Sequence, residues 1–92
     1  MTQLILFEAF RDMAEIQSLL REMKYWDPDL NLTCEARRTE GHEFVYRVTE
    51  DEVKLDHEQF TNNLSAVLTF EKDVDAVQFK MKYAGTYEIL EE

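Results

Sequence analysis

The chain contains few of the residues that form cross-links or flexible linkers. Its 92 residues include one cysteine, two glycines and one proline. A single cysteine, Cys34, excludes an internal disulfide and favours a reducing compartment. So little glycine and proline leaves no room for a linker, and we therefore expect residues 1–92 to form one domain.

Long apolar runs are also missing. None approaches the roughly 18 residues of a membrane-spanning helix, so we expect no membrane partner. The first residues, MTQLILFEAF, lack a basic region and place Glu8 inside the apolar stretch, which is typical of a buried strand rather than a signal peptide. These absences predict a cytoplasmic protein.

Positive charge is scarce too. Twenty Asp and Glu outweigh ten Lys and Arg, which gives a net charge of −10; small soluble domains usually carry a magnitude of about 2–8. Binding to phosphates needs Lys and Arg, so we expect no direct contact with nucleic acid. Apolar residues make up 45% of the chain, which predicts a globular core. The acidity has two interpretations, a solvated surface and recognition of a basic partner.

Hydrophobic periodicity divides the chain into strands and helices. Strands are expected over residues 3–10, 30–39, 42–49 and 76–83, with a short edge strand after Gly85. Helices are expected after two capping boxes, Asp12 with Glu15 and Asp56 with Gln59. The second helix is expected to reach Leu68, but its weak helix formers leave a strand over residues 64–70 as the alternative.

The expected order β-α-β-β-α-β predicts an α+β fold. It is typical of a ferredoxin-like sandwich, in which an antiparallel sheet carries two helices on one face. This fold hosts many functions and therefore does not identify one.

Motifs for catalysis and metal binding are missing from the sequence. Residues 50–58 are acidic but lack the central glycine of a calcium loop. No His-x-x-x-His pair or second cysteine offers a zinc site, and no glycine-rich phosphate loop is present. Cys34 falls on the apolar side of its strand, where a free thiol packs as a small hydrophobe. We expect no catalytic residues, no metal and no cofactor, and hence a protein that is not an enzyme.

The strand and helix assignments predict where charge gathers. Outward strand positions carry the basic residues Arg37, Arg47, Lys80 and Lys82, while the excess acid lies on helices and loops. The densest acidic stretch is VTEDEVKLDHE, residues 48–58. Carboxylates two residues apart on a strand lie ~6.6 Å apart, and those three or four apart on a helix lie ~5–6 Å apart. Such spacings match nucleic-acid phosphates to within side-chain reach. The residues we expect to contact a basic partner are Glu50, Asp51, Glu52, Asp56, Glu58, Glu71, Asp73 and Asp75.

The short length, the acidity, the single domain and the missing catalytic motifs resemble the small DNA-mimic inhibitors of bacteriophages, in particular their anti-restriction proteins. The resemblance covers the chain as a whole and rests on no motif, so no residue role transfers from it. It implies a homodimer whose acidic surface imitates duplex DNA. It also implies a host restriction endonuclease, or another DNA-binding protein, as the target in the host cytoplasm.

Two other functions fit the same sequence. An adaptor would bind a protein through Tyr25, Trp26 and an open sheet edge. However, Trp26 follows Met23 at helical spacing, so we expect the two aromatic residues to close the core over the helix end. A small regulatory domain would instead bind a metabolite between subunits.

Overall fold

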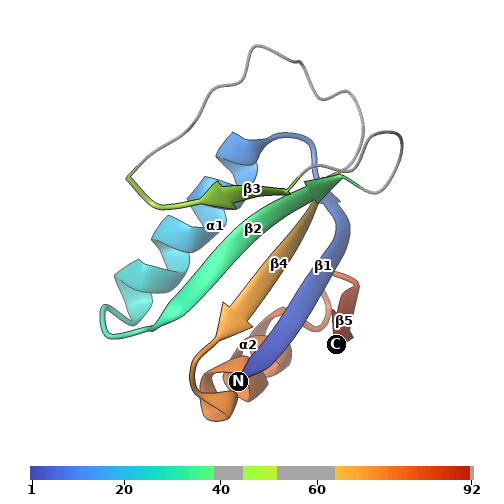
Figure 1. The fold of residues 1–92 in the computed structure, drawn as a ribbon. Coiled ribbons are helices and arrows are strands. Elements are labelled where there is room, and N and C mark those ends of the chain that lie inside the picture. The colour runs from blue at the N-terminus through green and yellow to red at the C-terminus, as the bar shows by residue number, and fades with distance from the viewer. Residues whose placement is uncertain (39–44, 52–63, 92) are drawn as a thin grey trace.

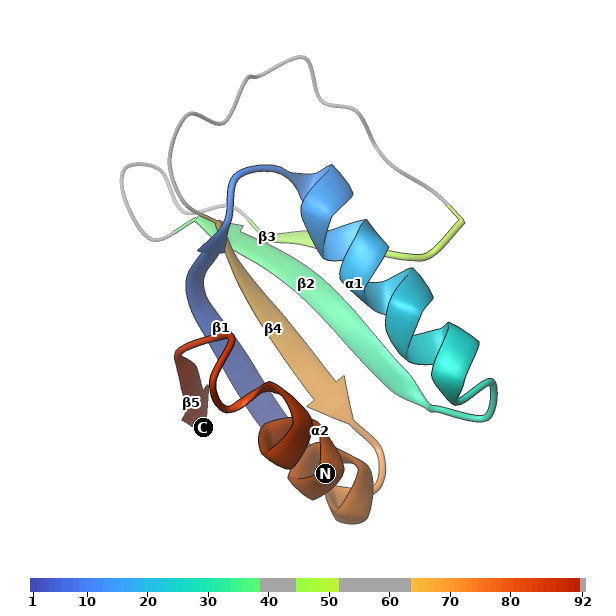
Figure 2. The same ribbon diagram turned by 180° about the vertical axis from the view of Figure 1, so that it is seen from behind.

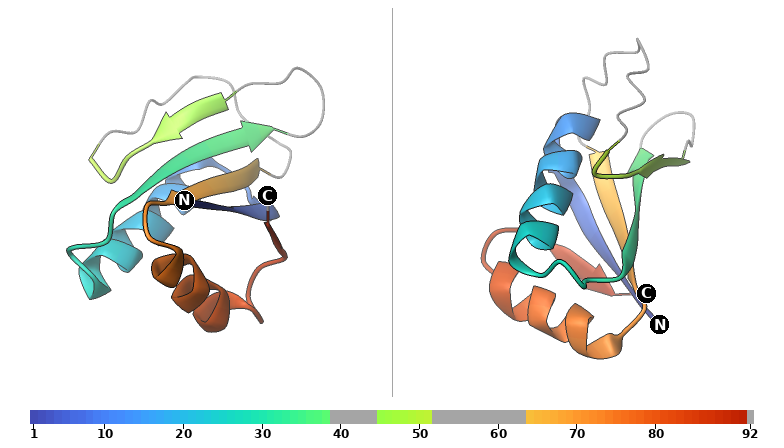
Figure 3. Two further views of the ribbon diagram at one scale, coloured as in Figure 1. Left: turned by 60° about the horizontal axis from the view of Figure 1, so that its bottom comes forward. Right: turned by 90° about the vertical axis from the view of Figure 1, so that its left-hand side faces the viewer.

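The computed structural model describes residues 1–38, 45–51 and 64–91, which form an α+β fold with a five-stranded antiparallel sheet and two helices (Figure 1). The strands are β1 (Thr2–Phe10), β2 (Leu32–Arg38), β3 (Val45–Val48), β4 (Leu64–Phe70) and β5 (Ile89–Glu91). The helices are α1 (Met13–Trp26) and α2 (Asp73–Tyr83). Both helices cover the same face of the sheet, as the view from behind (Figure 2) and the edge-on view (Figure 3) show.

The sheet order is β3-β2-β4-β1-β5, and every neighbouring pair is antiparallel. Helix α1 connects β1 to β2, and β4 lies between these two strands. Helix α2 connects β4 to β5, and β1 lies between them. Each helix therefore crosses over one strand, and the two crossovers interlock at the centre of the sheet.

The first strand and helix agree with the sequence prediction. In β1, Leu4, Leu6 and Phe10 are buried against the helices. Asp12 caps α1, because its carboxylate accepts a 3.0 Å hydrogen bond from the Glu15 backbone N–H. In return, the Glu15 carboxylate accepts from the Arg11 N–H at 3.2 Å. Asp12 therefore caps the helix where the sequence predicts, while the return bond of Glu15 goes to Arg11, one residue before the N-cap that a strict capping box would use.

A bulge interrupts β1 at Glu8. The register passes from Leu6 opposite Ala66 to Phe10 opposite Leu64, so β1 uses two more residues than β4 over this distance. Glu8 has a positive φ of 46°, an uncommon conformation for a residue with a side chain. Its N–H is satisfied by the Ser65 hydroxyl oxygen at 2.9 Å.

The predicted hairpin is confirmed in its described part. β2 pairs with β3, and Cys34 lies opposite Val48. The turn residues 39–44 lie outside the described residues. The short edge strand after Gly85 is also confirmed, because β5 pairs with the outer side of β1.

The prediction of a second helix reaching Leu68 is wrong. Residues 64–70 form β4, the alternative, while the predicted cap at Asp56 lies outside the described residues. β4 has a strand on each side, and residues on both of its faces are buried, including Ser65 and Val67. A central strand of this kind carries a continuous apolar run, which periodicity does not distinguish from a helix.

The predicted strand over residues 76–83 is also wrong, because these residues belong to α2. Ala76, Phe79 and Tyr83 are buried at helical spacing, while Val77 and Met81 are exposed on the other side. Apolar residues on both sides of the helix imitate the alternation of a strand. Acidic residues in the first turn and lysines in the last turn favour the helix through its dipole.

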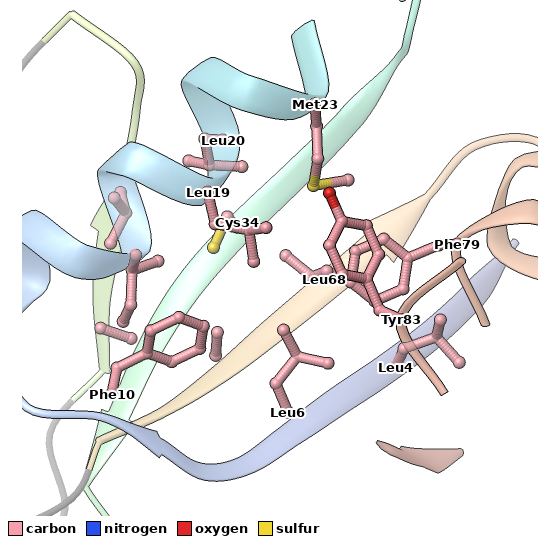
Figure 4. Close-up of a cluster of buried hydrophobic side chains, with 14 of the residues drawn as sticks. Leu4, Leu6, Phe10, Leu19, Leu20, Met23, Cys34, Leu68, Phe79 and Tyr83 are labelled. Carbon is pink, nitrogen blue, oxygen red and sulfur yellow. The ribbon is translucent and has the colours of Figure 1, made fainter. Parts of the chain in front are cut away.

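The core lies between the sheet and the two helices (Figure 4). Phe79 of α2 contacts Phe70 of β4 with ring centroids 5.8 Å apart, and it stacks on Tyr83 at 4.6 Å. Cys34 is buried beneath α1 as the predicted small hydrophobe. This single core layer holds both helices against the sheet. It therefore also fixes the ends of the strands, where acidic residues lie.

Candidate functional site: an acidic end of the sheet

Five of the eight predicted partner-binding residues lie in the described part of the chain, and all five lie at one end of the sheet. Glu50 and Asp51 follow β3, Glu71 follows β4, and Asp73 and Asp75 occupy the first turn of α2. The strand directions explain this grouping: β3 and β4 both run antiparallel to β2, so both end where β2 begins. Three predicted residues lie outside the described residues: Glu52, Asp56 and Glu58.

Two further acidic residues share this end of the sheet. Asp27 and Asp29 lie in the connection from α1 to β2, and both are exposed. The Asp27 carboxylate accepts a hydrogen bond from the Asp29 N–H at 3.2 Å, which orders the connection. The sequence prediction did not include these two residues in the site, because the direction of a strand is not visible in a local sequence pattern.

Glu50 is held against α1. Its carboxylate pairs with Lys24 at 3.1 Å, and its backbone carbonyl accepts from Arg21 Nε at 3.1 Å. Gln17, which is buried, donates to the carbonyls of Thr49 at 3.1 Å and Glu50 at 3.2 Å. Helix α1 therefore positions the exit of β3 and partly neutralises Glu50, while Asp51 is exposed.

The turn from β4 into α2 is held by neighbouring segments. The Glu71 N–H donates to the Asn31 carbonyl at 3.2 Å, and the Asn31 amide donates to the Glu71 carboxylate. The Asp73 carboxylate accepts from the Thr2 hydroxyl and lies 3.3 Å from the Met1 amino group. These contacts, the Thr2 hydrogen bond first, lower the pKa of Asp73.

Acidic residues outnumber cationic groups at this end of the sheet. The described ion pairs join Met1 to Asp73, Lys24 to Glu50, and Lys80 to Glu91. Within the described ranges, Asp27, Asp29, Asp51 and Asp75 belong to none of these pairs. The cationic groups at this end are Arg21, Lys24, the Met1 amino group, Lys72 and Lys82. The acidic residues outnumber them, so this end of the sheet carries a modest net negative charge.

The predicted separation of charge between the two layers is wrong in one respect. Lys80 and Lys82 lie on α2, in the helix layer, and not on outward strand positions. Arg37 and Arg47 do lie on strands, on β2 and β3. The helix layer therefore carries lysines as well as acidic residues.

Tyr25 and Trp26 do not close the core as predicted. Their exposed fractions are 77% and 68%, and their rings meet edge to face at 5.4 Å. Lys82 Nζ lies 5.6 Å from the Trp26 ring centroid and 5.4 Å from that of Tyr83. A cavity of about 180 Å³ opens beside Trp26, between the end of α1 and α2, and Asp27 and Asp75 contribute to its lining.

Other chemistry is limited in the described part of the chain. There, no group of three or more His, Cys, Asp or Glu residues is arranged to hold a metal ion. Burial, with a smaller effect from Glu35, raises the pKa of the Cys34 thiol to about 12, so little thiolate forms at neutral pH. No helix in these ranges combines the length and hydropathy needed to cross a membrane.

Comparisons with protein-family models, curated proteins and solved structures gave no match.

Proposed function

We propose that the protein inhibits a DNA-binding protein, such as a restriction endonuclease, by presenting carboxylates in place of DNA phosphates. The observation that supports this proposal is the convergence of acidic residues from three separate segments at one end of the sheet. These segments are the α1–β2 connection, the exit of β3 and the turn into α2. Solubility requires dispersed charge and gives no reason for such convergence.

Rigidity supports the same proposal. A phosphate mimic gains affinity when its charges are held in place before binding, because less side-chain and loop entropy is lost. Glu50 is fixed through Lys24, Glu71 through Asn31, and Asp73 through Thr2. The acidic end is therefore preorganised by contacts to α1, β1 and the residue before β2.

We infer that the scaffold is a ferredoxin-like sandwich extended by β3. If β3 is set aside, the remaining strands have the order β2-β4-β1-β5, and each helix connects two strands that flank a third. Adding β3 beside β2 carries Glu50 and Asp51 to the acidic end. The extension thus adds charge to a surface that the four-stranded core already positions.

The proposal is tested by capture of proteins from bacterial lysate on the immobilised chain. A target of a DNA mimic should be displaced by excess duplex DNA, and its binding should weaken steeply as salt rises. The charge-reversal variant Asp51→Lys/Glu71→Lys changes one residue from each of two acidic segments. We expect it to weaken capture roughly tenfold, because like charges are then opposed at the interface.

The matched control is Glu22→Lys/Glu88→Lys, which makes the same change in net charge outside the three acidic segments. Both glutamates are exposed, on α1 and just before β5. Capture should fall far less in this control than in Asp51→Lys/Glu71→Lys. Equal losses in the two variants would show that net charge alone governs binding, and an interaction that ignores both DNA and salt would refute mimicry.

An adaptor function is the second candidate, and the exposure of Tyr25 and Trp26 favours it. Exposed aromatic residues beside a cavity are common anchors of protein interfaces. In this case Trp26→Ala should abolish capture, and rising salt should have little effect. The response to salt therefore separates the two candidates in one experiment.

A further inference from the structure

The cavity between the end of α1 and α2 has a largely aromatic wall. Its volume is about 180 Å³, and Figure 4 shows two of its lining residues, Met23 and Tyr83, directed towards each other from the two helices. An apolar cavity of about 150 Å³ holds one benzene molecule, so this cavity has room for one compact ligand. The apolar residues of the wall are Met23, Trp26, Leu30, Phe70, Phe79 and Tyr83.

Two carboxylates of the lining have no fixed cationic partner. Asp27 and Asp75 belong to none of the ion pairs described for residues 1–38, 45–51 and 64–91. Asp75 is half-buried, which reduces the screening of its charge by salt. Asp27 is the C-cap of α1, where the helix dipole adds partial negative charge. The mouth of the cavity therefore favours a cation.

The structure already holds one cation against the aromatic wall. Lys82 Nζ lies 5.6 Å from the ring centroid of Trp26 and 5.4 Å from that of Tyr83. Both distances fall within the roughly 6 Å over which a cation is attracted to an aromatic face. In the described part of the chain Lys82 belongs to no ion pair, although two carboxylates line the same cavity. The aromatic faces are thus the groups that attract this ammonium.

The chemistry of the wall selects one class of cation. A primary ammonium has three N–H donors to satisfy, and most of this wall offers no hydrogen-bond acceptor. A quaternary ammonium spreads its charge over methyl groups, which pack on aromatic and aliphatic surface and leave no N–H donor unpaired. Aromatic residues recognise choline and methylated lysine in this way.

We propose that the cavity binds a small, free quaternary ammonium compound. Its head group packs against Trp26 and the aromatic wall, and Asp27 and Asp75 balance its charge. Lys82 is exposed, and its flexible stem allows the ammonium group to leave the ring for solvent. Lys82 thus competes with the ligand for the same aromatic surface. Binding of this kind does not depend on the proposed inhibition of a DNA-binding protein.

Titration of the purified full chain with choline at constant ionic strength tests the proposal. Trp26 is the only tryptophan in the sequence, so its fluorescence reports on this cavity. We expect a saturable change with a dissociation constant on the order of 1 mM or below, as befits a ligand of few atoms. The control ligand is the neutral carbon analogue of choline, in which a tert-butyl group replaces the trimethylammonium group. It should bind at least roughly tenfold more weakly, and equal binding of the two would refute recognition of a cation.

The carboxylates are tested by a matched pair of variants. Asp75→Asn removes one charge from the lining and should weaken choline binding roughly tenfold. Asp29→Asn removes the same charge from an exposed residue that is not part of the lining, and binding should stay within about threefold of the natural chain. Equal losses in the two variants would mean that choline responds to net charge alone, which would overturn the site.

Removing the competing lysine should strengthen binding. Lys82→Met keeps an apolar stem and should lower the dissociation constant for choline at least about threefold. Lys72→Met makes the same charge change outside the lining, at a residue whose side chain forms no capping bond, and should have a smaller effect. Equal effects in the two variants would refute competition by Lys82. An absence of saturable binding in both the natural chain and Lys82→Met, with both folded by circular dichroism, would overturn the proposal.

Discussion

Removing the hydroxyl of Tyr83 should stabilise the protein. Tyr83 is 8% exposed, and its hydroxyl is buried without a hydrogen-bond partner among the residues that the structure describes. Figure 4 shows the hydroxyl end directed towards Met23, a side chain that offers only a weak acceptor. A buried polar group left unpaired costs about 1–3 kcal/mol. Tyr83→Phe removes this cost and keeps the ring that stacks on Phe79 at 4.6 Å.

We therefore expect Tyr83→Phe to raise the free energy of unfolding by about 1 kcal/mol. Urea denaturation should show a higher midpoint with an unchanged m value, and the melting temperature should rise by about 4–8 °C. Tyr87→Phe is the matched control, because Tyr87 is half-buried and its hydroxyl is not among the buried unpaired atoms. It should change stability by less than about 0.5 kcal/mol. A loss of about 1 kcal/mol or more in Tyr83→Phe would refute the reasoning, because it would mean that the hydroxyl forms a favourable hydrogen bond.

Three more predictions follow from the core and the termini. Phe79→Ala should destabilise the fold by about 3–5 kcal/mol in urea denaturation, because it removes the ring between Phe70 and Tyr83; a loss below about 1 kcal/mol would contradict the packing of α2. The pKa of Cys34 rises from 9.0 to about 12 on folding, so stability is fully present below pH 9 and falls as pH rises towards 12. Cys34→Ala should therefore lose less stability than the natural chain as pH rises from 9.0 towards 12. Identical slopes of the free energy of unfolding against pH in the two proteins would exclude this contribution of Cys34. The pKa of Asp73 is lowered from 3.8, so its stabilising effect is present above that pH and is lost as pH falls through the folded value. The difference in urea midpoint between the natural chain and Asp73→Asn should therefore disappear in acid, and a difference that persists there would have another origin.

Local signals were sufficient for the first four elements of the fold, β1, α1, β2 and β3. The capping box of Asp12 and Glu15 locates the start of α1, because it depends on side chains within one turn. The alternation through β2 and β3 predicts the hairpin for the same reason. In each case the signal and the structure it determines lie within a few residues of each other.

The two wrong assignments have a common physical cause. Whether LSAVLTF is a strand depends on neighbours from β1 and β2, which lie far away in the chain and cover its edges. Whether AVQFKMKY is a helix depends on which apolar residues meet the core, and Val77 and Met81 do not. Sequence periodicity reports apolar residues without telling core from exposed surface. The residues that misled the prediction of α2 are thus exposed apolar residues on the side of the helix that faces away from the core.

The candidate site was predictable in composition but not in arrangement. Glu71, Asp73 and Asp75 could be selected as a cluster because they are adjacent in sequence. Their association with Asp27 and Asp29 follows from the directions of β2 and β4, which only the sheet order determines. The prediction placed Tyr25 and Trp26 in the core because the helical spacing continues from Met23. In the structure the buried side of α1 ends at Met23, and the last turn of the helix, with Tyr25 and Trp26, is exposed.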